Sequence, residues 1–189
     1  GVSAKAGTFT PNATQNSTTE SASLGHAPEL IFFICVGSTT ADTLTTNAIL
    51  SFGFAANDTT HRMIAYGQQT AATNEVATLL YSETRCVGQV FNDVTTWTGE
   101  VTTFGADTFT MTTREGASGS DVCFFLSLGG DLSFDTGTLT TLTGTGDSVV
   151  ATDVAADAIL LALSTATGTT IHADSGANGF MVGLADDTG

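Results

Sequence analysis

The sequence is poor in positive charge. It has 4 Lys and Arg residues against 19 Asp and Glu residues, which gives a formal net charge of −15 at pH 7. Nucleic-acid binding and docking on an anionic membrane both need clustered Lys and Arg to neutralise phosphate groups. The composition therefore excludes a nucleic-acid-binding protein and argues against a protein that works on a membrane surface.

Long apolar stretches are absent as well. The longest apolar run, residues 30–36, is far shorter than the roughly 18 residues that a membrane span requires. The first six residues lack the basic and apolar regions of a signal peptide, so we expect that any export signal was removed or never existed. Loss of an initiator Met before Gly1 explains this start equally well.

The chain has few cysteines, and they are not spaced like the ligands of a metal site. Cys35, Cys86 and Cys123 cannot all pair within one chain, and no C-x-x-C motif is present. Cys35 and Cys123 lie inside apolar runs, where a free cysteine behaves as a small hydrophobic residue. We expect three reduced structural thiols. The alternative is a bridge between Cys35 and Cys123 on neighbouring strands, which leaves Cys86 unpaired.

The residues that are abundant favour β-structure. Thr makes up about a fifth of the chain, and the sequence has 21 Gly and only 2 Pro. Charged residues make up 12% and hydrophobic residues 41%, which is a globular rather than a disordered composition. Short apolar segments with turn residues between them predict an antiparallel β-sandwich or jelly roll. The predicted strands are residues 7–10, 18–24, 29–36, 48–55, 61–67, 76–82, 86–92, 99–104, 108–113 and 121–128, with a weak alternative of a helix over 69–80.

The apolar pattern within the strands differs. Residues 30–36 and 122–128 are almost continuously apolar, which is typical of strands covered on both faces by a second sheet or by a partner subunit. Residues 108–112 alternate instead, which predicts that Phe109 and Met111 point into the core.

An internal repeat divides the chain. Gly7-Thr8-Phe9-Thr10 returns at 137–140, the apolar segment 27–33 at 155–161, and the segment 50–55 at 180–185, with offsets of about 128 to 130 residues. We therefore predict a β-sandwich module over residues 1–130 and a partial repeat with its first four strands over 131–189. Half a sandwich has an open edge and an uncovered apolar face. We expect the native chain to continue beyond Gly189 or another chain to complete the half module, in preference to its strands extending the first module.

Four short segments carry a resemblance to a known family. They are Pro28-Glu29-Leu30-Ile31-Phe32-Phe33, Ser51-Phe52-Gly53-Phe54-Ala55, Asp107-Thr108-Phe109-Thr110-Met111 and Phe124-Phe125-Leu126-Ser127-Leu128-Gly129-Gly130. Their order resembles that in a family of tailed-bacteriophage virion-associated structural proteins with tandem β-sandwich modules. This chain differs in having Glu29 where that family has Lys, and Ala106-Asp107 ahead of Thr108. The resemblance implies a structural role on a virion and brings no catalytic residues.

Side chains that could support catalysis are few. His26, His61 and His172 are the only good general bases, and Ser118 does not lie in a Gly-x-Ser-x-Gly elbow. A glycosidase needs a pair of carboxylates beside the bond that it cleaves, and the candidates in this chain are Glu83, Asp93, Glu100 and Asp121. Sugar-binding platforms are limited to Trp97, Tyr66 and Tyr81. We therefore predict that the protein is not an enzyme and assign no catalytic residues.

No metal or cofactor is predicted. Calcium is the most credible ion because the loops are acidic, with Asp147, Asp153, Asp157 and Asp186-Asp187 as candidate ligands. No D-x-[DN]-x-[DN]-G loop is present, so we interpret these residues as solvated turns. The sequons at Asn12, Asn16 and Asn57 arise from the Thr-rich composition and do not indicate a location.

The expected function is that of a non-enzymatic virion subunit, in capsid decoration or in the tail and fibre apparatus. Its expected partners are other virion protein subunits, including copies of itself in a homo-oligomer such as a trimer, with no nucleic acid and no membrane. Its expected location is the virion, an extracellular particle assembled in the host cytoplasm. Two alternatives are a receptor- or glycan-binding tip module that uses Trp97 and the loops near Asn57 and Gly116, and a secreted filament or surface-layer subunit completed by strand exchange.

Overall fold

The computed structural model describes residues 1–37, 48–57, 59–69, 76–91, 94–116, 121–137, 139, 158–164, 172–174 and 180–186. None of its described segments is a helix long and apolar enough to cross a membrane. The strands are β1 (Val2–Phe9), β2 (Thr18–Glu20), β3 (Leu30–Val36), β4 (Ala48–Ala56), β5 (His61–Gln69), β6 (Val76–Ser82), β7 (Val87–Phe91), β8 (Val94–Phe104), β9 (Phe109–Gly116), β10 (Cys123–Gly130), β11 (Ala158–Ser164), β12 (His172–Asp174) and β13 (Phe180–Asp186).

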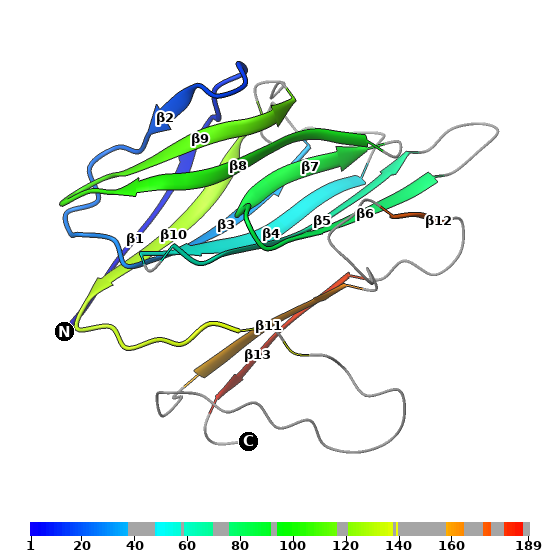
Figure 1. The fold of residues 1–189 in the computed structure, drawn as a ribbon. Coiled ribbons are helices and arrows are strands. Elements are labelled where there is room, and N and C mark those ends of the chain that lie inside the picture. Colours follow the sequence, from blue (N-terminus) through cyan, green and yellow to red (C-terminus); the bar gives the residue numbers. More distant parts are fainter. Residues whose placement is uncertain are drawn as a thin grey trace.

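Two antiparallel sheets pack face to face and form a β-sandwich (Figure 1). The larger sheet has seven strands in the order β1-β10-β3-β4-β5-β6-β12, and the smaller has four in the order β2-β9-β8-β7. The predicted fold class is therefore confirmed. Strands distant in sequence are neighbours, since β10 lies between β1 and β3 and brings residues 123–130 against both.

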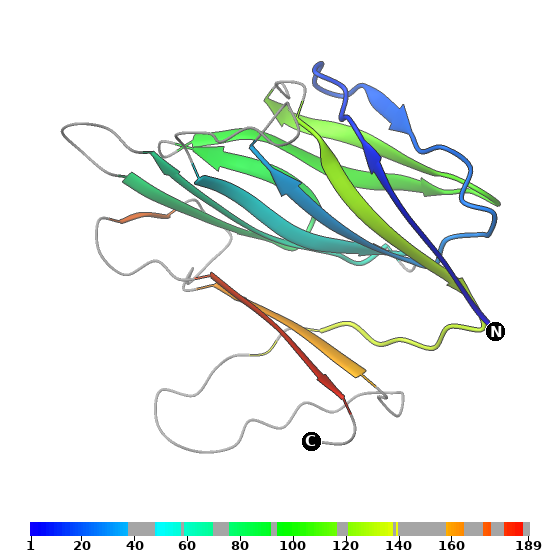
Figure 2. The ribbon, with the colours of Figure 1, turned by 180° about the vertical axis from the view of Figure 1, so that it is seen from behind.

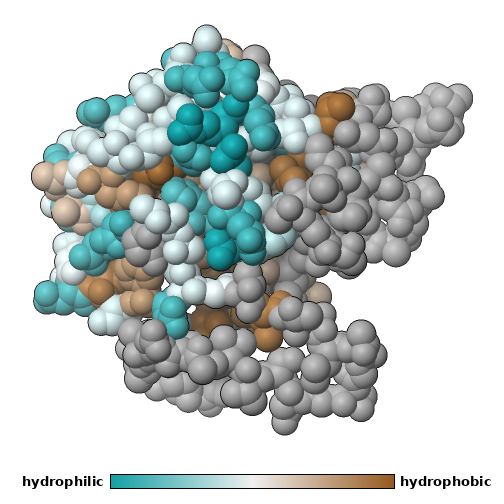
Figure 3. All heavy atoms as spheres, viewed as in Figure 1, coloured by the Kyte–Doolittle hydropathy of each residue, from teal (hydrophilic) through white to brown (hydrophobic). Residues whose placement is uncertain are grey.

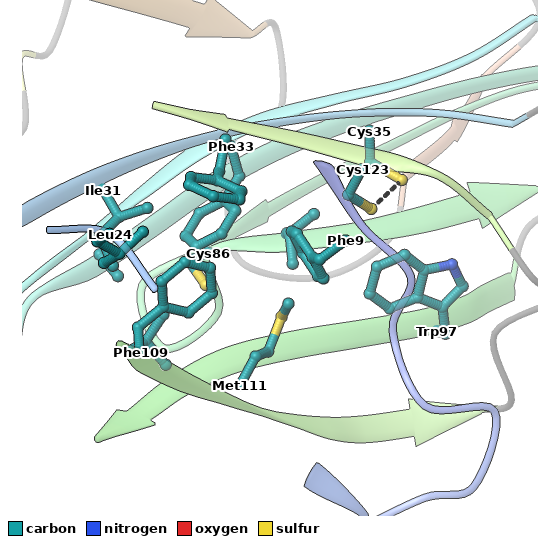
Figure 4. Close-up of a cluster of buried hydrophobic side chains, with 14 residues drawn as sticks. Phe9, Leu24, Ile31, Phe33, Cys35, Cys86, Trp97, Phe109, Met111 and Cys123 are labelled. Carbon is teal, nitrogen blue, oxygen red and sulfur yellow. Dashed lines mark hydrogen bonds between the residues drawn. The ribbon is translucent and has the colours of Figure 1, made fainter. Parts of the chain in front are cut away.

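The core lies between the two sheets and is rich in aromatic rings (Figure 4). Phe9, Phe33 and Phe109 meet edge to face, with ring centroids 5.7 to 6.0 Å apart. Phe125 adds a further edge-to-face contact with Phe109 at 5.2 Å. Such contacts contribute about 0.5–1.5 kcal/mol each beyond the apolar area that they bury. The inward positions predicted for Phe109 and Met111 are confirmed, since both side chains are buried.

Glycine allows the two sheets to touch where β7 crosses the larger sheet. A Cβ atom on Gly53 of β4 would lie 2.2 Å from the carbonyl oxygen of Cys86. A Cβ atom on Gly67 of β5 would lie 1.9 Å from the carbonyl oxygen of Val90. Any larger residue at either position would push the backbone of β7 away from the sheet.

The ten predicted strands of the first module correspond to β1 through β10. Two strands begin five residues earlier than predicted, β1 at Val2 and β8 at Val94, and β2 ends at Glu20 instead of Leu24. The pairing of β8 with β7 and β9 is also irregular. The weak prediction of a helix over 69–80 is wrong for residues 76–80. Val76 to Ser82 form β6, because their pairing with β5 places Leu79 and Leu80 in buried positions.

Three strands are described after residue 139, and two of them lie on the other side of the larger sheet. β11 and β13 pair into a two-stranded antiparallel sheet, which lies opposite the four-stranded sheet (Figures 1 and 2). β12 pairs with β6 and forms an edge of the seven-stranded sheet. One strand of this region therefore does extend the first sheet, the outcome that the sequence analysis placed last.

Candidate functional site

One face of the seven-stranded sheet points away from the core and is strongly apolar. Register places its side chains in rows across the strands, because residues paired on neighbouring antiparallel strands point to the same face. One row runs from Phe124 through Ile34 and Phe52 to Ile64. We call the set the outer apolar face; it comprises Phe32, Ile34, Leu50, Phe52, Phe54, Ile64, Phe124 and Leu126.

The outer apolar face is most exposed on β3 and β10. Phe124 is 48% exposed, Ile34 43% and Leu126 40%. Ile64 on β5 is buried, and β11 approaches that strand. The four-stranded sheet covers the inner face of residues 30–36 and 122–128, as predicted, and cover of the outer face by a partner subunit stays a prediction. Within the described residues, the four-stranded sheet covers one face, while the other leaves large apolar side chains in contact with solvent.

The outer apolar face is ordered by ring contacts. Phe32 stacks on Phe52 with ring centroids 6.4 Å apart, and its edge meets Phe54 at 6.5 Å. A second row runs from Leu126 through Phe32 and Phe54 to Arg62. The Arg62 guanidinium donates hydrogen bonds to the carbonyl oxygens of His61 and Glu83. Hydrophobic residues are visible at the surface between hydrophilic ones in Figure 3. Large exposed apolar patches are found at interaction sites of proteins.

The outer surface of the four-stranded sheet has the opposite character. Glu100 accepts hydrogen bonds from Arg85, at 2.9 Å, and from Arg114, and Arg85 also lies 3.9 Å from Glu115. Thr102 on the same side lies 3.0 Å from the hydroxyl of Thr112. Two of the four basic residues of the chain are thus paired with carboxylates on this sheet, which makes it a solvated polar surface.

The candidate bases do not gather into a catalytic arrangement in the part of the chain that is described. His26 Nε2 lies 3.0 Å from Ser127 Oγ, a contact that sequence reasoning missed because the residues are 101 positions apart. Ser127 is fully buried, so its hydroxyl cannot reach a substrate. His61 faces two carbonyl oxygens, those of Thr59 and Val101. His172 lies on β12, away from both in the sheet order, and Ser118 lies outside the described residues.

The carboxylates proposed for a glycosidase have other partners. Glu83 accepts a hydrogen bond from the Tyr81 hydroxyl at 2.8 Å, and Glu100 belongs to the arginine network described above. Asp121 is buried and accepts a hydrogen bond from Trp97 Nε1 at 3.0 Å. Asp93 lies outside the described residues.

Of the three aromatic platforms named for a glycan-binding surface, Tyr66 and Tyr81 are half-buried and Trp97 is not available. Trp97 is fully buried against the core, as Figure 4 shows, so its indole cannot stack on a sugar. This placement contradicts the expectation that Trp97 contributes to a binding surface. The physical reason is local, because alternation along β8 turns Trp97, Gly99 and Val101 toward the other sheet.

No group of three or more His, Cys, Asp and Glu side chains in the described segments is arranged to hold a metal ion. Of the calcium candidates, Asp147, Asp153, Asp157 and Asp187 lie outside those segments, and Asp186 ends β13.

Two ionisable groups at the ends of the sandwich, Tyr81 and Asp107, have pKa values that differ clearly from the ordinary ones. Burial, followed by the hydrogen bond to Glu83, raises the pKa of Tyr81 to about 12. The hydrogen bond donated by Ser23, with a second from the Gly25 amide, lowers the pKa of Asp107. Both groups hold turns or edges in place. The charge of His26 also helps to lower the pKa of Asp107, and the charge of Glu83 helps to raise that of Tyr81.

Sequence reasoning identified the strands of the outer apolar face but not that face itself. The signal was present in Ser51-Phe52-Gly53-Phe54-Ala55, where large apolar residues alternate with small ones, so that the bulky side chains point away from the core. Comparison with protein-family models, with curated proteins and with solved structures finds no match to this chain.

Proposed function

We propose that the protein is a non-enzymatic structural subunit of a tailed-phage virion, on the capsid surface or in the tail and fibre apparatus, and that it acts through contacts with other protein subunits. The observation that carries this proposal is the outer apolar face, with Ile34, Phe124 and Leu126 exposed on adjacent strands. Apolar groups of this size at a surface are typical of interfaces that a partner covers.

Three of the four segments that resemble the virion family lie close together in the fold, which supports the proposal. The segment 28–33 runs into β3, 51–55 lies on β4 and 124–130 on β10, three neighbouring strands of one sheet. Phe32, Phe54 and Phe124 from these segments all belong to the outer apolar face. The fourth segment, 107–111, runs into β9 of the other sheet and belongs to the core.

The partner that we propose is a further copy of this chain or another virion subunit. At a net charge of −15, copies repel one another at low ionic strength, whereas the outer apolar face itself holds no acidic side chain among its eight residues. Salt screens the long-range repulsion over about 10 Å at 0.1 M and leaves apolar contact intact. Association should therefore strengthen with added salt or divalent cation.

Sedimentation velocity of the purified chain tests this contact. We expect the wild type to sediment as an oligomer in high salt and the Leu126→Asp variant to remain monomeric, because the new carboxylate would be buried in the interface without a partner. Thr103→Asp adds the same charge at an exposed position on the other sheet and should behave as the wild type. Sedimentation of the wild type that does not change between low and high salt would contradict the proposed association.

The location is tested separately in purified particles. Mass spectrometry should find the chain in particles banded by density, and cryo-electron microscopy should place sandwich-shaped density on the capsid or tail. A chain found only in the soluble fraction of the lysate would exclude the virion role while leaving self-association open.

A second candidate, a filament or surface-layer subunit completed by strand exchange, is favoured by the two-stranded sheet of β11 and β13. Isolated two-stranded sheets are at best marginally stable, and this one leaves Met181 65% and Leu184 80% exposed. A filament subunit should polymerise without limit when purified alone, whereas a virion subunit should stop at a small oligomer. Electron microscopy of the purified chain separates the two.

A further inference from the structure

The pairing of β3 with β10 places two cysteines directly opposite each other. Cys35 pairs with Cys123 in that antiparallel ladder, and the two Sγ atoms lie 2.6 Å apart, as the dashed line in Figure 4 marks. Opposed residues of antiparallel strands have Cα atoms about 4.5 or 5.5 Å apart. Both values fall within the roughly 4.4–6.8 Å that disulfides span. The backbone therefore needs no movement to accept a bond between these sulfurs.

The two sulfurs lie closer together than in ordinary packing. Even carbon atoms, which are smaller than sulfur, rest about 3.5–4.0 Å apart when they are not bonded. A disulfide bond measures about 2.03–2.05 Å. At 2.6 Å, the Sγ atoms of the two free thiols are in direct contact, with Cys123 donating its S–H to the sulfur of Cys35.

The third thiol has a different environment. Cys86 is buried at the crossing of β7 with the larger sheet, and its thiol lies 3.5 Å from the carbonyl oxygen of Gly99. Burial raises the pKa of Cys86, so the group stays protonated and unreactive. Burial raises the pKa of Cys123 in the same way, so the specificity comes from position: Cys35 and Cys123 lie opposite each other, whereas the Cys86 thiol contacts a carbonyl oxygen.

We propose that Cys35 and Cys123 form a disulfide bond that joins β3 to β10 in the centre of the seven-stranded sheet, with a low-molecular-weight disulfide such as oxidised glutathione as the oxidant. All three cysteines are free thiols in the structure, as the sequence led us to expect, and the proposal concerns the form that the chain reaches in the presence of this oxidant. It rests on the sandwich alone and is independent of the proposed virion role.

The reaction is an ordinary thiol–disulfide exchange in two steps. The thiolate of one cysteine attacks a sulfur of oxidised glutathione, which forms a mixed disulfide and releases one glutathione thiolate. The second cysteine thiolate then attacks the protein-side sulfur of the mixed disulfide and releases the second glutathione. Two protein thiols are oxidised, one glutathione disulfide is reduced to two thiols, and the two protons pass to glutathione.

The folded environment determines when this exchange takes place. Both sulfurs are fully buried, so oxidised glutathione cannot reach them in the closed sandwich. Burial and the neighbouring Cys35 thiol raise the pKa of Cys123, which suppresses the thiolate needed for attack. The bond should therefore form while the chain folds, before the four-stranded sheet closes over the pair. Once formed, it should resist reductants until the protein unfolds.

Peptide mapping of the wild-type protein tests the proposal without any variant. Trypsin cuts after Lys5, Arg62, Arg85 and Arg114, so each cysteine lies on its own peptide, 6–62, 86–114 or 115–189. The chain is unfolded in reductant, refolded with oxidised and reduced glutathione, alkylated in denaturant and digested. We expect a linked pair of peptides 6–62 and 115–189, and an alkylated Cys86.

The stability of the same samples provides the second readout. The bond closes a segment of 88 residues, and a loop of this order lowers the unfolding equilibrium constant about a thousandfold. Reductant added under unfolding conditions should lower the stability of the wild type and of Cys86→Ser by this factor. The stability of Cys35→Val should not change, because this variant cannot form the bond. Alkylation of all three cysteines in protein that has refolded in the presence of oxidised glutathione, or a link that involves Cys86, would overturn the proposal.

Discussion

Two strand pairs in this molecule have the same register and very different surroundings. In the first, β3 pairs with β4 so that Phe33 lies opposite Gly53 and Ile31 opposite Ala55. In the second, β11 pairs with β13 so that Leu161 lies opposite Gly183 and Ile159 opposite Ala185. The positions that coincide are those that the internal repeat aligns, at offsets of 128 residues for one strand and 130 for the other.

The burial of the two pairs differs sharply. Ile31 and Phe33 are fully buried under the four-stranded sheet, whereas Ile159 is 46% and Leu161 41% exposed. Gly53 lies directly under the backbone of β7, whereas nothing lies within 4 Å of a Cβ atom placed on Gly183. Strand pairing alone therefore does not make a core. The second pair has the side-chain pattern of a covered sheet but lacks a covering layer among the described residues.

The largest expected contrast is between matching truncations of the two pairs. Phe33→Ala should lower the free energy of unfolding by about 3–5 kcal/mol, because it leaves a cavity among packed rings. Leu161→Ala should cost less than about 1 kcal/mol, because the side chain is already exposed to water. The measurement is urea unfolding followed by the fluorescence of Trp97, the single Trp of the chain, which reports on the sandwich core.

The same experiment reveals whether the second pair is covered in solution. A loss of unfolding free energy for Leu161→Ala as large as that for Phe33→Ala would mean that a partner buries β11 and β13. Repeating the measurement over a range of protein concentrations would then identify that partner as another copy of the chain, because the loss would grow with concentration.

The glycines provide a smaller contrast of the same kind. Gly53→Ala should destabilise the protein by about 1–3 kcal/mol, because the new methyl group would overlap the Cys86 carbonyl oxygen and displace β7. Gly183→Ala should change stability by less than about 0.5 kcal/mol, because its Cβ would lie in open space. Thermal unfolding of the two variants side by side measures the difference. Equal losses would show that a backbone also lies against Gly183.

The sequence predicted the strands well because their signals are local. Apolar alternation and turn residues located β1 through β10, and the apolar runs correctly placed β3 and β10 at the centre of a sheet. The surroundings of each strand depend on contacts between distant residues, which the pattern does not carry. Phe33 and Leu161 look alike in sequence, but Phe33 packs against Phe9 and Phe109, and β7 crosses its strand partner Gly53. Trp97 was misplaced for the same reason, since its burial depends on the partner sheet.

The smallest effect that we predict concerns the ionisation of Tyr81, which lies in the same row of paired residues as Phe52 and Ile64. Its pKa is raised from 10.0 to about 12 by burial first and by Glu83 second, so the folded state holds the phenolic proton more tightly than the unfolded state. The contribution of Tyr81 to stability is then complete below about pH 10 and is lost as the pH rises toward 12. Near-ultraviolet absorbance of the folded wild type minus that of Tyr81→Phe should show this late phenolate. Glu83→Gln should move the transition only part of the way toward pH 10, because burial persists. If Tyr81 of the folded wild type is already fully ionised near pH 10, its side chain is not buried. The surface of β5 and β6 would then be as exposed to solvent as the pair of β11 and β13.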